Sequence, residues 1–383
     1  MKDNNLINVK WFRHGHEDRN DWLRFGFMKL NAKNEITYQE WELKDMLKYG
    51  FATEILDCPD LRHKSFILIE YDSIQTKCLV DSEDSFVLFS ELLIHVDIYF
   101  CAGYNSDVFI HKNLPKFYDW QTENELKWYK NELTIKIDKF SDHFYKVKKF
   151  IPIAPNLFKE YPINIIKKRF YNLDDKIRKV IGSPSNYASV YKIYKKRYNA
   201  LINLRNQPLT YDVTLNDSLW GWPNHRIKLH QALKKLALNG FLINSILKYG
   251  EPSIHDNSKT LNLNPNNFPI TIGSIDDYEK MLANSKLGVF ACGFHWGWRN
   301  ILTLALFFGI PVTTDRLLTE AYFDIHKFKI YEIEDENWTL VGDLLKDIDL
   351  DKWNRIKEHN QKIFDQYLTP EVVAKYLLSQ TCK

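Results

Sequence analysis

The sequence is poor in the residues that cross-link small secreted chains or anchor membrane proteins. Its five cysteines are odd in number and scattered, and no C-x-x-C pair occurs, so neither a disulfide framework nor a zinc ribbon is indicated. The longest apolar run, residues 301–312, falls well short of the ~20 residues that a bilayer-spanning helix needs. The first ten residues hold no apolar signal core. These absences predict a soluble, cytoplasmic protein with reduced cysteines.

Net charge is also small, and several familiar motifs are missing. A net charge of +3 argues against a dedicated nucleic-acid binder, so no nucleic-acid partner is expected. There is no Walker loop, G-x-G-x-x-G, H-E-x-x-H or G-x-S-x-G. ATPases, nicotinamide enzymes, zincins and α/β-hydrolases are therefore not indicated.

What is present is the composition of a globular protein with more than one core. The chain has 383 residues, of which 45% are hydrophobic and 26% charged, and this length predicts two domains. Periodicity breaks over residues 206–225, where proline, glycine and tryptophan lie close together. We therefore predict one domain over 1–205 and a second over 206–383.

The hydrophobic patterns predict an α/β protein. In the first domain they favour strands at 6–12, 66–73, 77–81 and 96–105, a helix over 86–94 and helical structure from about 159 to 205. The second domain alternates regularly. Helices are expected at 225–240, 274–285, 298–309, 335–348, 351–368 and 369–379, and strands within 240–250 and at 286–293, 310–315 and 326–334. Such alternation predicts a doubly wound parallel sheet.

The stretch from Ala291 to Asp315 holds the main candidate site. A strand is expected to end at Gly293, and a helix to begin near Trp298 or Arg299. The amino end of a helix stabilises phosphate, a glycine such as Gly297 lets an anion approach the backbone, and an arginine can grip two phosphate oxygens. The backbone of 298–300 and Arg299 are thus predicted to hold a diphosphate. The alternative is a surface arginine stacked on a core tryptophan.

The same stretch resembles a known family. Gly293, His295 and Arg299 form a G-x-H-x-x-x-R pattern before an apolar helix, followed by "GIPV" at 309–312 and the acids Asp315 and Glu320. This order is similar to the donor-binding domain of GT-B fold glycosyltransferases, over roughly residues 270–383. Many retaining members carry two glutamates at positions that are Trp296 and Leu304 here, so the resemblance does not imply that retaining group.

The resemblance implies two Rossmann-like domains that face a cleft, with the last helix, about 370–383, packing back on the first domain. It implies transfer of a sugar from a nucleotide-sugar to a hydroxyl of a glycan, free or lipid-linked, without a resident cofactor. Arg226, at a helix start, would join Arg299 on the donor diphosphate in place of a metal. The donor-binding residues expected are Arg226, Gly293, His295, Arg299, Asn300, Asp315 and Glu320. A helix-surface charge is the alternative for Arg226, and an exposed glutamate for Glu320.

A second candidate site lies in the loop after the first strand. His14 and His16, close to Glu17 and Asp18, could supply a general base that takes the proton of the acceptor hydroxyl. The alternative is a polar surface loop. An H-x-H pair also suits a metal, but no third ligand has a helpful spacing, so no metal is expected.

Three basic clusters, at 146–150, 166–171 and 194–198, fall in the first domain. A basic helix face beside aromatic residues can rest on anionic lipid, although such a face is usually only solvated. If the acceptor is lipid-linked, the protein would work at the inner face of the membrane, in polysaccharide biosynthesis. Two alternatives to a transferase remain open: another two-Rossmann sugar-nucleotide enzyme such as an epimerase, and a non-catalytic glycan- or nucleotide-binding protein.

Overall fold

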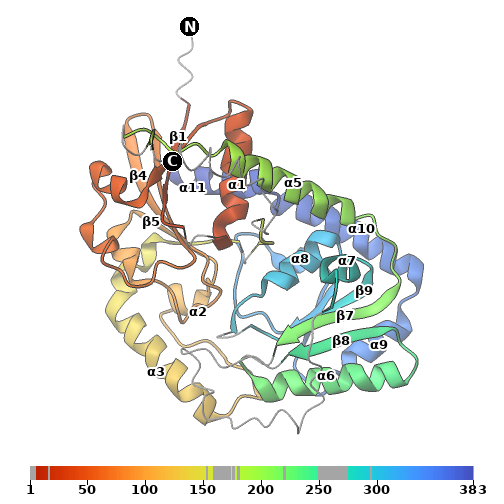
Figure 1. Cartoon of the computed structure of the whole chain (residues 1–383). Helices are drawn as coiled ribbons and strands as arrows, with labels where there is room; N and C mark the ends of the chain where they lie inside the picture. The colour runs from red at the N-terminus through yellow and green to blue at the C-terminus, as the bar shows by residue number, and fades with distance from the viewer. Residues whose placement is uncertain are drawn as a thin grey trace.

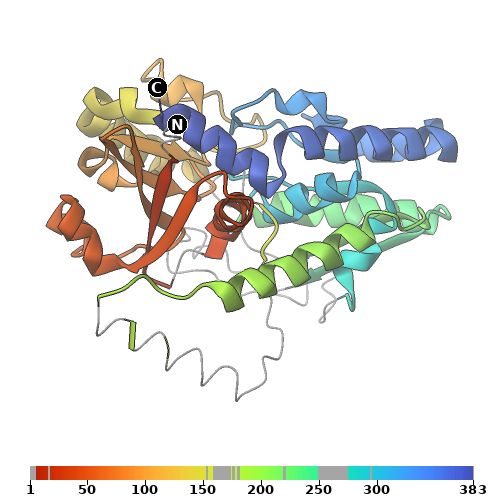
Figure 2. The same cartoon turned by 90° about the horizontal axis from the view of Figure 1, so that it is seen from above.

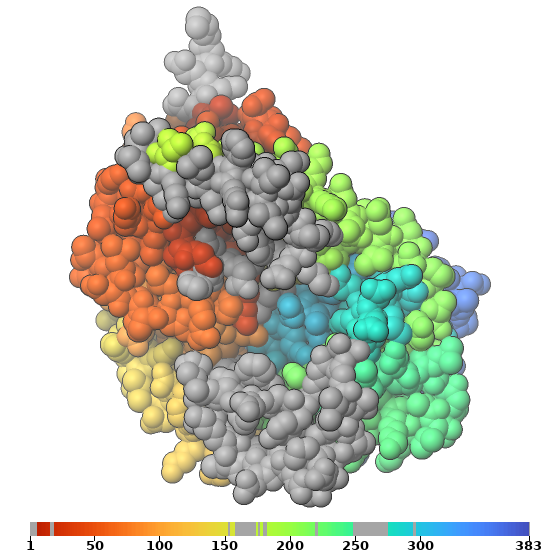
Figure 3. Space-filling model, in the orientation of Figure 1, coloured from red at the N-terminus to blue at the C-terminus, as the bar shows by residue number. Residues whose placement is uncertain are grey.

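The computed structural model describes residues 6–15, 18–151, 154–157, 174, 177–178, 182–218, 221–248, 275–293 and 296–382. Within them the chain builds two β-sheets with helices on their faces (Figure 1). We call the part around the sheet of strands β1–β6 the first unit, and the part around β7–β11 the second unit. Figure 3 shows the red-to-yellow surface of the first unit beside the green-to-blue surface of the second.

The first sheet has the order β2-β1-β3-β4-β5-β6. Its strands are β1 (Asn8–Arg13), β2 (Thr37–Glu42), β3 (Lys64–Tyr71), β4 (Ile74–Asp81), β5 (Ile98–Cys101) and β6 (Val147–Lys149). β3 runs antiparallel to both of its neighbours, whereas the other pairings are parallel. Asp72 and Ser73, at φ 47° and 67°, form the two-residue turn between β3 and β4, and such turns join antiparallel strands.

The helices of the first unit are α1 (Asp21–Ala32), α2 (Ser106–Phe109) and α3 (Glu123–Phe140). Thr122 and Glu125 form a capping box at the start of α3. The helix expected over 86–94 is wrong: only a short 3-10 turn, η4 (Glu91–His95), occurs there. Residues 86–90 instead bring buried aromatic rings to a loop, which a hydrophobic pattern alone does not distinguish from a helix. The other 3-10 turns are η1 (Asp18–Asn20), η2 (Leu43–Tyr49), η3 (Thr53–Ile55), η5 (Ser141–Lys146) and, in the second unit, η9 (Ile325–Lys327).

The second sheet is parallel throughout and has the order β11-β10-β9-β7-β8. Its strands are β7 (Tyr211–Ser218), β8 (Ile243–Lys248), β9 (Ser285–Phe290), β10 (Val312–Asp315) and β11 (Ile330–Ile333). The helices around it are α6 (Pro223–Leu238), α7 (Tyr278–Ala283), α8 (Asn300–Phe308) and α9 (Thr339–Asp347). The doubly wound sheet expected for this half is confirmed. Ser274, the first residue of the helix expected at 274–285, lies outside the described residues.

Three further helices join the units: α5 (Ala188–Leu204), α10 (Leu350–Tyr367) and α11 (Pro370–Thr381). In Figure 2, α10 and α11 run from the second unit toward the first, and α11 packs on α1. Gly26 of α1 allows this approach, because a Cβ there would lie 2.0 Å from the carbonyl oxygen of Pro370. The indole of Trp22 also donates a hydrogen bond to the Leu368 carbonyl at 2.7 Å.

The hydrophobic core crosses between the units. One cluster of buried side chains runs from β1 and α1 through α5 to α8, α10 and α11. The ring of Trp22 meets those of Phe307 and Phe364 edge-on, at 5.9 and 6.1 Å between centroids. The predicted boundary at 205/206 falls between the end of α5 and the start of β7, and it stays a prediction. None of the described helices combines the length and apolarity needed to cross a bilayer.

Candidate donor site between the units

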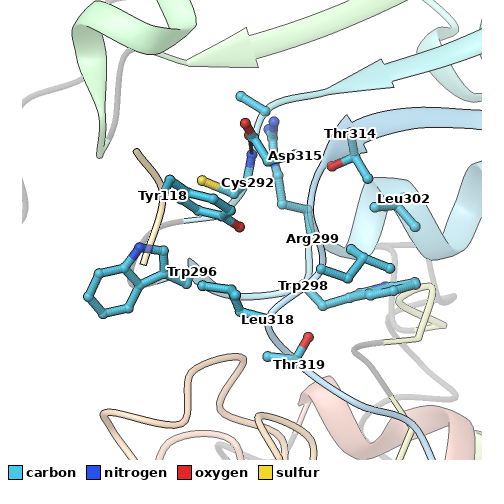
Figure 4. Close-up of a pocket in the computed structure, with 14 residues that line it drawn as sticks. Tyr118, Cys292, Trp296, Trp298, Arg299, Leu302, Thr314, Asp315, Leu318 and Thr319 are labelled. Atoms are coloured by element: carbon cyan, nitrogen blue, oxygen red, sulfur yellow. Dashed lines mark hydrogen bonds between the residues drawn. The ribbon is translucent and has the colours of Figure 1, made fainter. Parts of the chain in front are cut away.

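The candidate site lies where β7, β9 and β10 end. Because these strands are parallel and adjacent, Asp217, Cys292 and Asp315 come together at one edge of the sheet, where doubly wound sheets bind ligands. A small pocket opens there against the first unit (Figure 4). Its lining residues are Tyr118, Ala291, Cys292, Gly293, Trp296, Gly297, Trp298, Arg299, Leu302, Thr314, Asp315, Leu317, Leu318 and Thr319.

A buried carboxylate, Asp217, organises the arginines of the site. Its Oδ1 accepts hydrogen bonds from Nη1 of Arg226 at 2.5 Å and from Nη2 of Arg299 at 2.7 Å. Burial alone would raise the pKa of Asp217, but the two guanidinium groups outweigh it and hold the pKa far below its usual value. Asp217 is therefore ionised, and one negative charge faces two positive ones.

Arg299 occupies the N-cap position of α8, one residue before the helix begins at Asn300. This agrees with the expected helix start. Its side chain is 16% exposed and lines the pocket. Nη2 is held by Asp217, whereas Nη1 is buried and has no hydrogen-bond partner among the described residues. Asn300 is exposed on the first turn of α8.

Arg226 is almost entirely enclosed and has its guanidinium occupied inside the protein. Nε donates to the Gly221 carbonyl at 2.9 Å, Nη2 donates to the Cys292 carbonyl at 3.1 Å, and Nη1 binds Asp217. Its exposed fraction is 3%. In this structure Arg226 holds the ends of β7 and β9 together, and its contact with a donor diphosphate stays a prediction.

Asp315 likewise has protein partners. Its Oδ1 lies 2.8 Å from Nε2 of His225, and its Oδ2 accepts the amide of Cys292 at 2.7 Å. The imidazole of His225 is stacked under the indole of Trp120, at 4.0 Å between centroids and 8° between planes. The first unit thus covers the end of β10 with an aromatic side chain.

Trp296 and Gly297 meet a loop of the first unit. The amide of Gly293 donates to the Gly297 carbonyl at 2.9 Å. Trp296, at φ 65°, stacks on Phe86 at 5.6 Å, so the core role considered for this tryptophan is the one that it has here. A Cβ on Gly297 would lie 2.4 Å from Cγ of Asp84, so the close approach of the units needs glycine there, and its contact with an anion stays a prediction.

Asp84 belongs to a charged group that the sequence patterns did not reveal. It lies in the loop after β4 with Glu83, and Nη1 of Arg19 is 3.6 Å from a carboxylate oxygen of each. Partial burial and the neighbouring Asp84 carboxylate raise the pKa of Glu83 to about 8. The sequence "VDSED" at 80–84 could have indicated this group, because acidic residues at the end of a buried strand lie at the edge of the sheet where ligands bind.

Glu320 lies at the boundary between the units. Its Oε1 accepts the Ser106 amide at 2.7 Å and the Ser106 hydroxyl, and its Oε2 binds Nζ of Lys149 at 2.5 Å. Burial would raise the pKa of Glu320, but the bonds from Lys149 and Ser106 lower it overall. The carboxylate links the second unit to the first, and its predicted contact with ribose or sugar is untested.

The histidines proposed as a base are only partly described. The ring of His14 lies after β1, and its Nε2 is 2.7 Å from the Lys64 carbonyl. β1 lies inside the sheet, between β2 and β3. His16, Glu17 and His295 lie outside the described residues. Within the part that the structure describes, no group of three or more histidine, cysteine or acidic side chains is placed to hold a metal ion.

Two α/β units built on largely parallel sheets, with a last helix that returns to the first unit, define the GT-B architecture, as the resemblance implied. No protein-family model matches the sequence. No curated protein matches it either.

Solved structures give matches of low identity. Anabaena HepE in complex with UDP and glucose is 11% identical, with 96% of this chain and 95% of that chain covered and a TM-score of 0.37. WaaG, a glycosyltransferase involved in lipopolysaccharide biosynthesis, is 13% identical, with 96% of both chains covered and a TM-score of 0.36. A putative UDP-N-acetylglucosamine 2-epimerase of Listeria monocytogenes is 12% identical, with 94% of this chain and 92% of that chain covered and a TM-score of 0.30. The GtfA/B complex is 16% identical, with 46% of this chain and 38% of that chain covered and a TM-score of 0.30.

Proposed function

We propose that the protein is a glycosyltransferase that moves a sugar from a nucleotide-sugar to a hydroxyl of a glycan, free or lipid-linked, without a metal ion. One observation carries this proposal. Three buried polar atoms have no hydrogen-bond partner among the described residues and belong to side chains of the same pocket: Nη1 of Arg299, Nε1 of Trp296 and Oγ1 of Thr319. Leaving such groups unpaired costs about 1–3 kcal/mol each, so a polar ligand that accepts their hydrogen bonds would be stabilised.

The chemistry needs a positive charge where the diphosphate leaves. Arg299 supplies it at the amino end of α8, whose unpaired amides favour an anion as well. The acceptor oxygen forms a bond to the anomeric carbon while the bond from that carbon to the diphosphate breaks. The acceptor proton passes to a base, for which His14, His16 and the loop carboxylate Asp84 are the candidates on the first unit.

A lipid-linked acceptor would bring the protein to a membrane surface. On α5, Lys192, Lys195 and Lys196 are exposed, whereas the ring of Tyr194 is buried. Lys149, in the first cluster, is instead bound to Glu320. The cluster at 166–171 lies outside the described residues. Co-sedimentation with anionic and with neutral vesicles tests the contact, and equal binding to both would contradict it.

Arg299 provides the test of the proposed activity. Arg299→Ala should weaken binding of UDP or GDP and nearly abolish transfer, while Asp217 stays paired with Arg226 and the fold is kept. A thermal-shift screen over UDP, GDP, CMP and their sugars measures binding, and release of the nucleotide measures turnover. Normal donor affinity in the variant would refute the assignment. Binding without any turnover in the wild type would favour a nucleotide-binding protein, and a product that is an isomeric sugar-nucleotide would favour an epimerase.

A further inference from the structure

Residues 116–121 of the first unit, which we call the plug, cross the carboxyl ends of β9 and β10. The plug lies between α2 and α3, and Tyr118 is its most buried aromatic residue. The ring of Tyr118 lines the candidate pocket together with Cys292 and Asp315 (Figure 4). Its hydroxyl donates to the Arg316 carbonyl at 2.7 Å, just beyond the end of β10.

Trp120 covers a second part of the same edge. Its indole lies flat on the imidazole of His225, which Asp315 holds from the other side. Trp120 also meets Trp222 edge-on, at 5.6 Å between ring centroids. The indole of Trp120 therefore already covers His225 and Trp222, the aromatic side chains of the second unit beside its strand ends.

Further contacts hold the plug, and in one of them the ring of Phe117 lies 4.7 Å from that of Trp296. Arg316 donates from Nη2 to the Lys116 carbonyl at 2.8 Å, and its guanidinium lies over the Tyr118 ring. Lys116 and Asp119 are exposed, and Trp120 is half-buried. None of these contacts is a backbone hydrogen bond within either sheet, so withdrawal of the plug would leave the strand pairing of both sheets intact.

Space beneath the plug is limited. The pocket leaves a cavity of only about 10 Å³, roughly the space of one water molecule, whereas small-molecule sites typically enclose roughly 300–1,000 Å³. A sugar-nucleotide cannot occupy the strand ends while Tyr118 and Trp120 remain there.

We infer that residues 116–121 form an autoinhibitory plug, which fills part of the donor site and must withdraw before a nucleotide binds. The inference rests on the proposed function. When only a fraction of the molecules is open, the apparent dissociation constant exceeds the intrinsic one by the inverse of that fraction. Loosening the plug should therefore tighten binding.

Two variants weaken the plug in different ways. Trp120→Ala removes the stack on His225, and Tyr118→Phe removes one hydrogen bond while keeping the ring. Because an aromatic pair and a hydrogen bond have similar strengths, each variant should lower the dissociation constant on the order of 2- to 12-fold. Trp41→Ala is the matched control, since Trp41 lies on the edge strand β2, is half-buried and contacts Tyr49 and Gln39.

Isothermal titration with UDP, GDP and UDP-glucose measures affinity in the full chain. Alkylation by iodoacetamide, mapped by mass spectrometry, gives a readout that needs no nucleotide: Cys292, 7% exposed beside Tyr118, should react several-fold faster in both plug variants. Cys101, 1% exposed within β5, should not change and serves as the internal reference.

Tighter binding and faster Cys292 alkylation in both plug variants, with Trp41→Ala unchanged, is the expected result. Weaker binding in Trp120→Ala would show that the indole contacts the ligand and would overturn the plug. Unchanged affinity, with nucleotide binding otherwise present, would overturn the plug alone. If neither the wild type nor any variant binds a nucleotide, the proposed function itself is refuted.

Discussion

Replacing Asp217 by asparagine tests whether the buried charge group holds the second unit together. Asparagine keeps the shape of the side chain but removes the charge that faces Arg226 and Arg299. Arg226 is 3% exposed, so it cannot turn to water once its counter-ion is lost. Breaking a buried ion pair in this way costs about 3–5 kcal/mol.

The expected loss is large enough to measure by urea unfolding at pH 7, followed by far-ultraviolet circular dichroism. In a unit of this size it corresponds to a fall in melting temperature on the order of 10 °C. Asp365→Asn is the control: Asp365 pairs with Arg205 at 2.8 Å but is 52% exposed, so at most about 1 kcal/mol should be lost. A double variant, Asp217→Asn with Arg226→Met, should recover part of the loss, because the more deeply buried guanidinium is removed and only that of Arg299, 16% exposed, is left without its counter-ion.

The reasoning would be refuted if Asp217→Asn unfolded within about 1 kcal/mol of the wild type. That result would mean that water or a rearranged partner reaches the guanidinium of Arg226. If the double variant were as unstable as Asp217→Asn alone, the lost stability would instead come from the missing carboxylate and not from an unpaired Arg226.

Two further predictions concern the loop after β4. Glu83 has a pKa raised to about 8 in the folded protein, so its contribution to stability is complete below about pH 4 and is lost as the pH rises through 8. Glu83→Gln cannot ionise, so it should remove this fall in the free energy of unfolding, which is on the order of 2–4 kcal/mol between pH 5 and 9. Unfolding free energies of both proteins, measured across pH, test this. Equal slopes in the two proteins would contradict it. Gly297→Ala should destabilise the protein by roughly 1–3 kcal/mol, because its Cβ would lie 2.4 Å from Cγ of Asp84. Gly342→Ala in α9 is the control, since that Cβ meets only Leu236, at 3.1 Å, and a thermal melt in which both variants behave alike would count against the close approach.

Local patterns were sufficient for four of the five strands described in the second sheet, but they missed β7, which lies within 206–225, where we expected only a break in periodicity. The strand ending at Gly293, the apolar helix and the strand at 310–315 were each marked by a glycine or a charged residue at their ends, and β9, α8 and β10 fall within a few residues of those limits. The first unit was harder to read. Its β3–β4 hairpin places an antiparallel strand inside the sheet, and the capping-box signal at Thr122 was present but unused.

The partners of the charged residues could not be read from the sequence. Arg226 lies nine positions from Asp217, but Arg299 lies 82 positions away, and only the strand order brings all three together. Periodicity reports which residues are buried, not what they bind. For the same reason Trp120 gave no sign that it would stack on His225.

The packing of α11 on α1 has a consequence for biosynthesis. Residues 18–151 leave the ribosome well before residues 368–381, so the carbonyl of Leu368 that binds Trp22 and the backbone of Pro370 that packs on Gly26 are missing until then. During that interval the side of α1 that α11 covers stays open. The part translated earliest is thus the last to reach its native state, and a nonsense mutation near codon 368 would damage the opposite end of the molecule.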